Sequence, residues 1–111
     1  MKTLPGTGCA LYYNDYEVFI EINAKAASTV DGILDTLQLP ENVKTTQQNA
    51  NAVWFTLPIL GQNWSPLKEN AYITFATDNS GKANVRFSNN TLSNINLIGS
   101  FSFPRSFFII S

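Results

Sequence analysis

The residues of this sequence that could carry out acid–base or metal chemistry are few. Histidine is absent, which removes the side chain that most often serves as a general base or a metal ligand. Cys9 is the single cysteine, so neither a Cys-His pair nor an intrachain disulfide can form. Serines occur throughout, but none stands in a G-x-S-x-G setting. Catalysis would therefore need a pair of carboxylates, as in glycoside hydrolysis.

Three carboxylate pairs are candidates for that chemistry: Asp31 with Asp35, Glu17 with Glu21, and Glu69 with Asp78. Glu17 and Glu21 are four residues apart in an alternating run, which separates them by about 13 Å along a strand, beyond the range of a catalytic pair. Asp31 and Asp35 flank a short predicted strand and are interpreted as turn and edge residues. Asp78-Asn79-Ser80-Gly81 lacks the later acidic positions of a calcium loop. We expect a non-enzymatic protein with no metal or cofactor.

Ligand binding is better supported, because sugar sites on β domains commonly combine an aromatic platform with amide and carboxylate hydrogen bonds. Trp64 is the best platform because it lies in the polar segment QNWSPLKEN. The nearby candidate ligand-binding residues are Gln62, Asn63, Glu69 and Arg86. The alternative for Trp64 is a loop aromatic that folds back over the core. Trp54 and Phe55 are adjacent in a predicted strand, so one faces inward and the other outward.

The elements that must position these residues are predicted to be strands. Turn signals recur about every ten residues with period-two runs between them, which indicates an all-β domain, either a compact antiparallel β-sandwich or a β-barrel of about seven to eight strands. The predicted strands cover residues 8–13, 16–24, 32–39, 52–60, 71–77, 82–87 and 94–103. Asn14-Asp15 is predicted as a two-residue hairpin turn that tolerates positive φ, residues 25–29 as a loop or one helical turn, and Gly99 as a bulge.

The hairpin of residues 71–87 has the clearest alternation. Its predicted inward side chains are Ile73, Phe75, Val85 and Phe87, which leaves Tyr72, Thr74, Asn84 and Arg86 on an outer or inter-subunit surface. The end of the chain, Phe107 to Ile110, is continuously apolar instead of alternating. Such a segment must be covered, either as a core strand or by a neighbouring subunit.

Size and charge narrow the functional classes further. The chain has 111 residues, which is one domain, and its net charge of −1 with no basic block argues against a nucleic-acid partner. Only 14% of residues are charged, so asparagine and threonine must supply much of the polar surface. No apolar run reads as a signal peptide or a membrane-inserted segment. We expect residues 1–7 to be a linker and residues 8–111 to be a single head domain, excised from the C-terminal part of a longer chain.

The order of three segments resembles a known family. The segments are DTLQLPENVKTTQQ, AYITFATDNSGKANVRF and INLIGSFSF, and the family is the C-terminal receptor-binding head domain of receptor-binding proteins and tail fibres of long-tailed bacteriophages with Gram-positive hosts. Leu39-Pro40-Glu41 stands at its leucine-proline corner, Gly81 at its hairpin turn and Gly99-Ser100-Phe101 in its closing strand. Val43-Lys44-Thr45 departs from the Arg-Pro pair that is common there. The chain also continues beyond that closing strand, and several members use a histidine that this chain lacks.

The resemblance implies a homotrimer at the phage tail tip, joined to an upstream tail or baseplate protein, that adsorbs the virion to a host cell-wall saccharide without catalysis. A threefold interface would also cover the apolar chain end. No family binding residue is carried over to this sequence. Two alternatives remain open: a structural trimerising cap or baseplate interaction module without a ligand, and a tail enzyme that degrades polysaccharide. A lectin-like or immunoglobulin-like module of a cellular adhesin is a third, and it should be monomeric.

Overall fold

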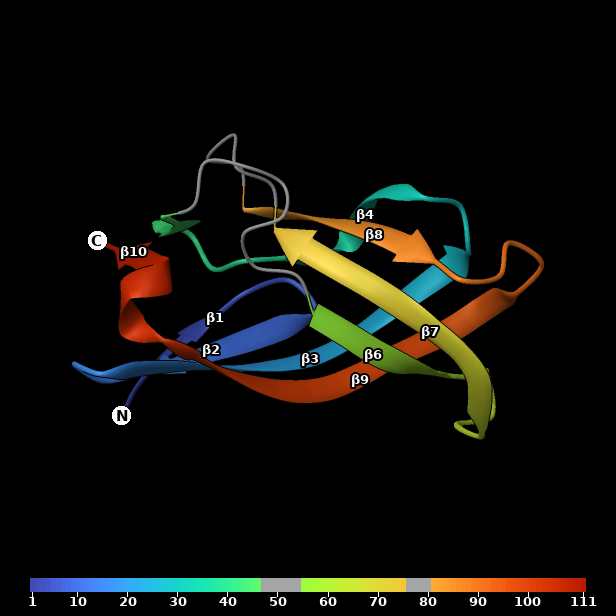
Figure 1. Ribbon diagram of the computed structural model, residues 1–111, viewed down its shortest axis with the longest axis horizontal. Coiled ribbons are helices and arrows are strands. Elements are labelled where there is room, and N and C mark those ends of the chain that lie inside the picture. The colour runs from blue at the N-terminus through green and yellow to red at the C-terminus, as the bar shows by residue number, and fades with distance from the viewer. Residues whose placement is uncertain (47–54, 76–80) are drawn as a thin grey trace.

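The computed structural model describes residues 1–46, 55–75 and 81–111. Within these ranges the chain is almost entirely β-structure, as Figure 1 shows. The elements are β1 (Lys2–Pro5), β2 (Cys9–Tyr13), β3 (Glu17–Ser28), β4 (Gly32–Gln38), β5 (Val43–Thr45), β6 (Phe55–Leu60), β7 (Pro66–Phe75), β8 (Lys82–Phe87), β9 (Ser93–Pro104), the 3₁₀ helix η1 (Arg105–Phe107) and β10 (Phe108–Ile110).

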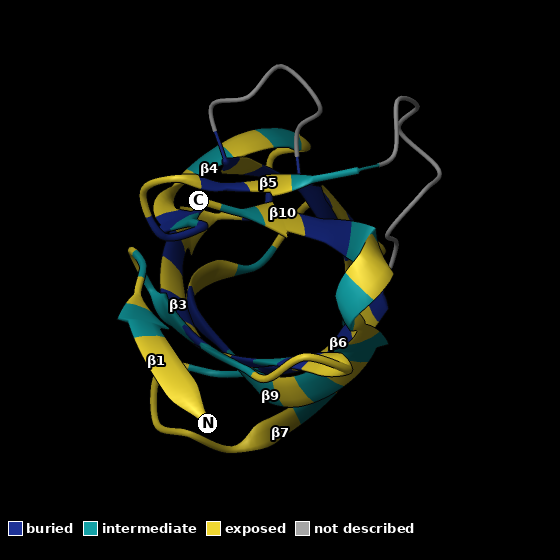
Figure 2. Ribbon diagram, turned by 90° about the vertical axis from the view of Figure 1, so that its left-hand side faces the viewer, coloured by how far each residue is buried: buried dark blue, intermediate teal, exposed yellow. Residues whose placement is uncertain are grey.

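Eight of these strands form one antiparallel sheet in the order β1-β2-β3-β9-β6-β7-β8-β4, and β10 pairs with β5 in a second, small sheet. The large sheet curls into a half-barrel around a common interior (Figure 2). Its far strand β4 returns toward the start of the chain, where Gln38 forms an antiparallel bridge with Thr7 and accepts a hydrogen bond from the Cys9 thiol. The Thr36 hydroxyl also donates to the Lys25 carbonyl of β3. The predicted all-β, compact antiparallel fold is confirmed.

The core fills the concave side of this sheet, because apolar side chains alternate with polar ones along the strands. Val18, Ile20 and Ile22 of β3 are all buried. The four predicted inward residues of the 71–87 hairpin are also buried: Ile73, Phe75, Val85 and Phe87. On the opposite face Tyr72, Asn84 and Arg86 are exposed, as predicted, whereas Thr74 is buried. Each fully buried large side chain contributes about 1.5–3 kcal/mol.

The first hairpin is present, but its turn is one residue later than predicted. The backbone N–H of Asn14 donates to the Glu17 carbonyl (3.1 Å), so Asp15 and Tyr16 are the two central residues. The Asn14 side-chain oxygen accepts hydrogen bonds from the backbone N–H groups of Tyr16 (2.8 Å) and Glu17 (2.9 Å). The side chain of Asn14 thus closes an Asx-type turn, and neither Asn14 nor Asp15 adopts the positive φ that these residue types tolerate.

Three further segments differ from the prediction. Residues 25–28 continue strand β3 and pair with β9, because the small Ala24 and Ala26 still alternate into the core. Gly99 lies in unbroken register opposite Ile22 and makes no bulge. Instead it lets Leu57 approach closely, since a Cβ at Gly99 would lie 2.1 Å from a Leu57 methyl carbon. The segment 1–7, expected as a linker, contains β1, which pairs with β2.

The apolar chain end is covered by its own chain. After η1, strand β10 pairs with β5 through Phe108 opposite Thr45 and Ile110 opposite Val43. The Phe108 side chain is 3% exposed and meets the Phe103 ring edge-on at 5.7 Å, while Ile109 points outward and is 52% exposed. Of the two predicted ways to cover this end, the structure uses the intrachain one. Trimer formation stays a prediction, but it is no longer needed to explain how the apolar chain end is covered.

The molecule is elongated, with principal extents of 39 × 26 × 19 Å. Both chain ends lie at one end of the long axis, and the turn that joins β6 to β7 lies at the other (Figure 1). No helix of the described ranges is long and apolar enough to cross a membrane.

Candidate functional site

The β6–β7 turn holds Trp64 away from the core. The turn is closed by hydrogen bonds from the Gly61 N–H to the Ser65 carbonyl (2.8 Å) and from the Trp64 N–H to the Gly61 carbonyl (2.9 Å). Trp64 itself adopts a left-handed backbone conformation, with φ of 67°. Its indole is 51% exposed. The alternative of an aromatic folded back over the core is therefore wrong.

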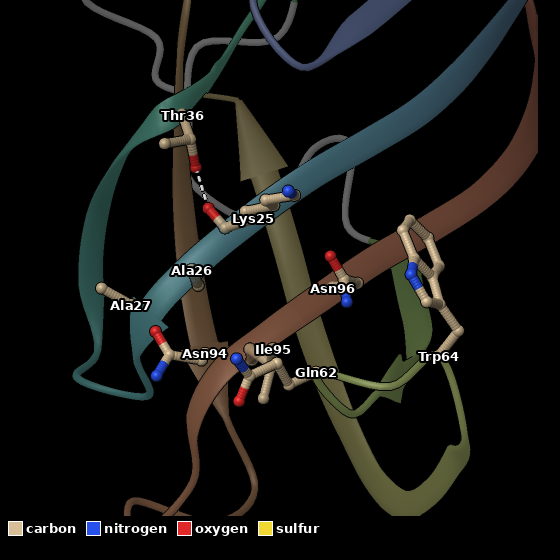
Figure 3. Close-up of a pocket in the computed structure, with 9 residues that line it drawn as sticks. All are labelled: Lys25, Ala26, Ala27, Thr36, Gln62, Trp64, Asn94, Ile95 and Asn96. Carbon is tan, nitrogen blue, oxygen red and sulfur yellow. Dashed lines mark hydrogen bonds between the residues drawn. The ribbon is translucent and has the colours of Figure 1, made fainter.

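An open groove of about 340 Å³ lies beside this indole, over the convex face of β3 and β9 (Figure 3). Figure 3 shows Trp64 on one side, Asn94 and Asn96 along β9, and Lys25 on β3. Lys25 and Asn96 are directly opposite in the ladder, so both belong to this outer face. The nine lining residues are Lys25, Ala26, Ala27, Thr36, Gln62, Trp64, Asn94, Ile95 and Asn96.

Asn96 ties the turn to the sheet. Its side chain is only 4% exposed, although it lies on the outer face of β9, because the turn covers it. The side-chain NH₂ donates to the Gly61 carbonyl at 3.0 Å. Its Oδ1 accepts no hydrogen bond from the described residues. One amide therefore fixes the turn that carries Trp64 and leaves an acceptor for a ligand hydroxyl.

The groove can hold a polar, uncharged ring system. Gln62, Asn94 and Asn96 supply amides that both donate and accept hydrogen bonds, and the indole supplies a flat apolar surface. Lys25 is the one charged residue in the lining, and none of the nine residues carries a carboxylate. The Thr36 hydroxyl already donates to a backbone carbonyl. The geometry thus favours hydrogen bonding and stacking, and the lining holds no carboxylate pair for acid–base chemistry.

Of the five residues predicted to bind ligand, the groove brings together Gln62 and Trp64. Asn63 stabilises the β6–β7 turn, since its side-chain oxygen accepts a hydrogen bond from the Ser65 N–H (3.3 Å). Glu69 is half-buried on β7 and accepts from the Asn89 amide (3.4 Å) instead of lining the groove. Arg86 lines a different hollow, over β6–β8. The five predicted residues therefore do not line one groove, and their role in ligand binding stays a prediction.

No protein-family model, curated protein or solved structure matches this chain. The resemblance to phage head domains consequently depends on the order of sequence motifs alone, and function must be argued from the groove.

Three residues of the groove were not predicted from the sequence: Lys25, Asn94 and Asn96. The signal for the two asparagines was present in the run Asn94-Ile95-Asn96-Leu97, where polar and apolar residues alternate, so that the asparagines share the outer face. Lys25 was placed in a loop or helical turn, which hid its position opposite Asn96.

Three of the carboxylates considered for catalysis, Asp31, Glu21 and Glu69, accept hydrogen bonds within the fold. Asp31 accepts a hydrogen bond from the Phe87 N–H (2.8 Å). Glu21 accepts one from the Tyr12 hydroxyl (3.3 Å), and its charge, with smaller effects of burial and of this bond, raises the pKa of Tyr12. No group of three or more metal-ligating side chains occurs in the described ranges.

Two earlier predictions concern residues outside the described ranges. Phe55 is buried and packs against Phe101 at a tilt, with ring centroids 4.5 Å apart, so it is the inward member of the Trp54–Phe55 pair. Trp54 itself, the carboxylate of Asp78 and most of the Asp78–Gly81 turn lie outside these ranges.

Proposed function

We propose that this domain binds a saccharide, without catalysis, in the groove between Trp64 and the outer face of β3 and β9. We further propose that it is the receptor-binding head of a bacteriophage tail protein, located at the tail tip and directed at a host cell-wall saccharide. The observation that carries the proposal is the exposed Trp64 indole, held by a closed turn beside a row of amides.

This arrangement matches the chemistry of a sugar ring. A pyranose has an apolar face of C–H groups that stacks on an aromatic side chain, and a rim of hydroxyls that pairs with amides. The groove volume of about 340 Å³ lies within the size range of small-molecule sites. The turn is already ordered by its own hydrogen bonds and by Asn96, so binding loses little conformational entropy on the protein side.

Trimer formation is the second part of the proposal. The resemblance supports it, and so do Val30 and Ile33, which are apolar side chains that the single chain leaves largely exposed near the start of β4. Three weak sites on one head would bind a repetitive surface polymer far more strongly than one site does. Light scattering of the purified protein tests this part, since a particle of one chain's mass at high concentration would exclude it.

A glycan array followed by titration calorimetry with the strongest ligand tests the groove. Trp64→Ala should weaken binding by about tenfold or more, which is about 1.4 kcal/mol. Tyr16→Ala is the matched control, because Tyr16 is also an exposed aromatic on a hairpin turn but does not line the groove. Binding that is unchanged in Trp64→Ala would contradict the proposal.

Two other results would support the alternatives. A trimer that binds no glycan would favour the structural cap or baseplate module. Release of oligosaccharide from purified host polysaccharide would favour the degrading enzyme.

A further inference from the structure

The hollow that contains Arg86 is separate from the Trp64 groove and shares none of its lining residues. It has a volume of about 420 Å³ and lies over β6, β7 and β8. Its lining residues are Phe55, Thr56, Tyr72, Arg86 and Phe87. All five belong to the described ranges, and three come from directly paired positions on adjacent strands.

Thr56, Tyr72 and Arg86 form one row across the sheet. Thr56 is opposite Tyr72 in the β6–β7 ladder, and Tyr72 is opposite Arg86 in the β7–β8 ladder. Directly paired residues have Cβ atoms about 4.5–5.5 Å apart on the same face of the sheet. A hydroxyl, a phenol ring and a guanidinium are thereby held at fixed spacing by the backbone, all on the exposed face.

The apolar surface of the hollow comes from Tyr72. Its side chain is 42% exposed on the outer face, whereas Phe55 and Phe87 alternate into the core on the opposite face and are each 8% exposed. An exposed aromatic ring offers a surface on which an apolar face of a ligand can stack. The hollow therefore combines stacking with polar groups, as small-molecule sites do.

Arg86 is the only charged residue of this lining, and it makes no ion pair or hydrogen bond with the described residues. Among the described residues, Asp31 places a carboxylate near β8, but it is not part of the lining and accepts a hydrogen bond from the Phe87 backbone. A guanidinium is charged at all physiological pH values, and its planar fork matches the two oxygens of a carboxylate or phosphate. The hollow thus has a cation that no described residue pairs with and that is suited to an oxyanion.

We infer that this hollow is a second binding site, which takes a small sugar-like ligand carrying a carboxylate or phosphate group. Arg86 binds the oxyanion, Tyr72 stacks on the ring of the ligand, and the hydroxyls of Tyr72 and Thr56 accept or donate hydrogen bonds beside it. The site is independent of the Trp64 groove, whose lining is dominated by amides.

Nuclear magnetic resonance titration of ¹⁵N-labelled protein tests this inference with three probes: methyl glucuronide, glycerol phosphate and neutral methyl glucoside. We expect saturable shifts of the Arg86 side-chain and Tyr72 backbone signals with at least one acidic probe, at dissociation constants of about 1–10 mM. The glucoside should give no saturable shift at these signals. Saturation by glucuronide alone assigns the site to a carboxylate, saturation by glycerol phosphate alone assigns it to a phosphate, and saturation by both shows a general oxyanion site.

Three variants make the test specific. Arg86→Gln should weaken binding of the acidic probe by about tenfold, whereas Lys68→Gln should leave it unchanged. Lys68 is the matched control, because it is an exposed cation of β7 that does not line the hollow. Trp64→Ala should also leave it unchanged, which separates this site from the proposed saccharide groove. Equal shifts with the neutral glucoside, no saturable shift with either acidic probe, or full binding in Arg86→Gln would overturn the inference.

Discussion

Replacing Phe108 with alanine tests whether the apolar chain end is packed within its own chain. Phe108 is 3% exposed, lies edge-on to Phe103 and forms the first pair of the β5–β10 ladder with Thr45. Its neighbour Ile109 is 52% exposed on the same short strand. The two side chains therefore differ in burial while they share a backbone environment, which makes Ile109→Ala the matched control.

The magnitude of each effect follows from that burial. Truncation of a fully buried phenylalanine costs about 3–5 kcal/mol of the free energy of unfolding, part of which is the aromatic pair with Phe103. For Phe108→Ala we expect about 3–4 kcal/mol, because β10 lies near the surface, where neighbours can close part of the cavity. Ile109→Ala removes only half as much buried surface and should cost about 1 kcal/mol or less.

Thermal and urea unfolding, followed by circular dichroism, measure both variants. A loss of 3–4 kcal/mol corresponds to a fall in Tm of about 12–20 °C for a domain of this size. Each scan is repeated at two protein concentrations tenfold apart. An intrachain contact gives the same difference in Tm between the variant and the unchanged protein at both concentrations, whereas a contact between subunits gives a difference that changes with concentration.

Two results would refute this reasoning. If Phe108→Ala and Ile109→Ala cost the same small amount, β10 is not packed as described. If Phe108→Ala lowers the free energy of unfolding only under conditions where the protein is oligomeric, the apolar chain end is covered by a second chain.

Three other predictions follow from local contacts. Gly99→Ala should cost about 1–3 kcal/mol in urea unfolding, because its methyl group would collide with buried Leu57, whereas Gly61→Ala, with no contact closer than 3.4 Å, should cost less. Burial raises the pKa of Cys9 to about 11 from 9.0. The folded protein should therefore react slowly with thiol reagents at pH 8, and its stability should fall as pH rises from about 9 to 11, a component that Cys9→Ala removes. Asn96→Ala should cost about 1–3 kcal/mol and quench or shift the indole fluorescence, because the Gly61 carbonyl loses one of its two donors.

The sequence was sufficient to predict the strands whose side chains alternate strongly. Ile73, Phe75, Val85 and Phe87 could be assigned to one face because period-two burial requires no knowledge of the neighbouring strands. The same reasoning failed at residues 25–28, where alanine gives a weak hydrophobic signal. It also missed strand β5, because Val43–Thr45 becomes a strand only by pairing with the distant chain end.

The candidate site was predicted in part for a related reason. Trp64 and Gln62 could be found because they lie together in one polar turn. Lys25 and Asn96 meet only through the register of β3 on β9, which a single sequence does not specify. The sequence did not reveal that Arg86 lies outside the Trp64 groove, because strand order, which places two strands between β8 and β9, is a long-range property.

The placement of the two chain ends opposite the β6–β7 turn has a practical consequence. A tag or tether fused to either end would orient the Trp64 turn away from a bead or sensor chip. Particles coated in this way would expose every indole to the medium and could agglutinate glycan-bearing cells, so a simple clumping assay could report on the groove before its ligand is identified.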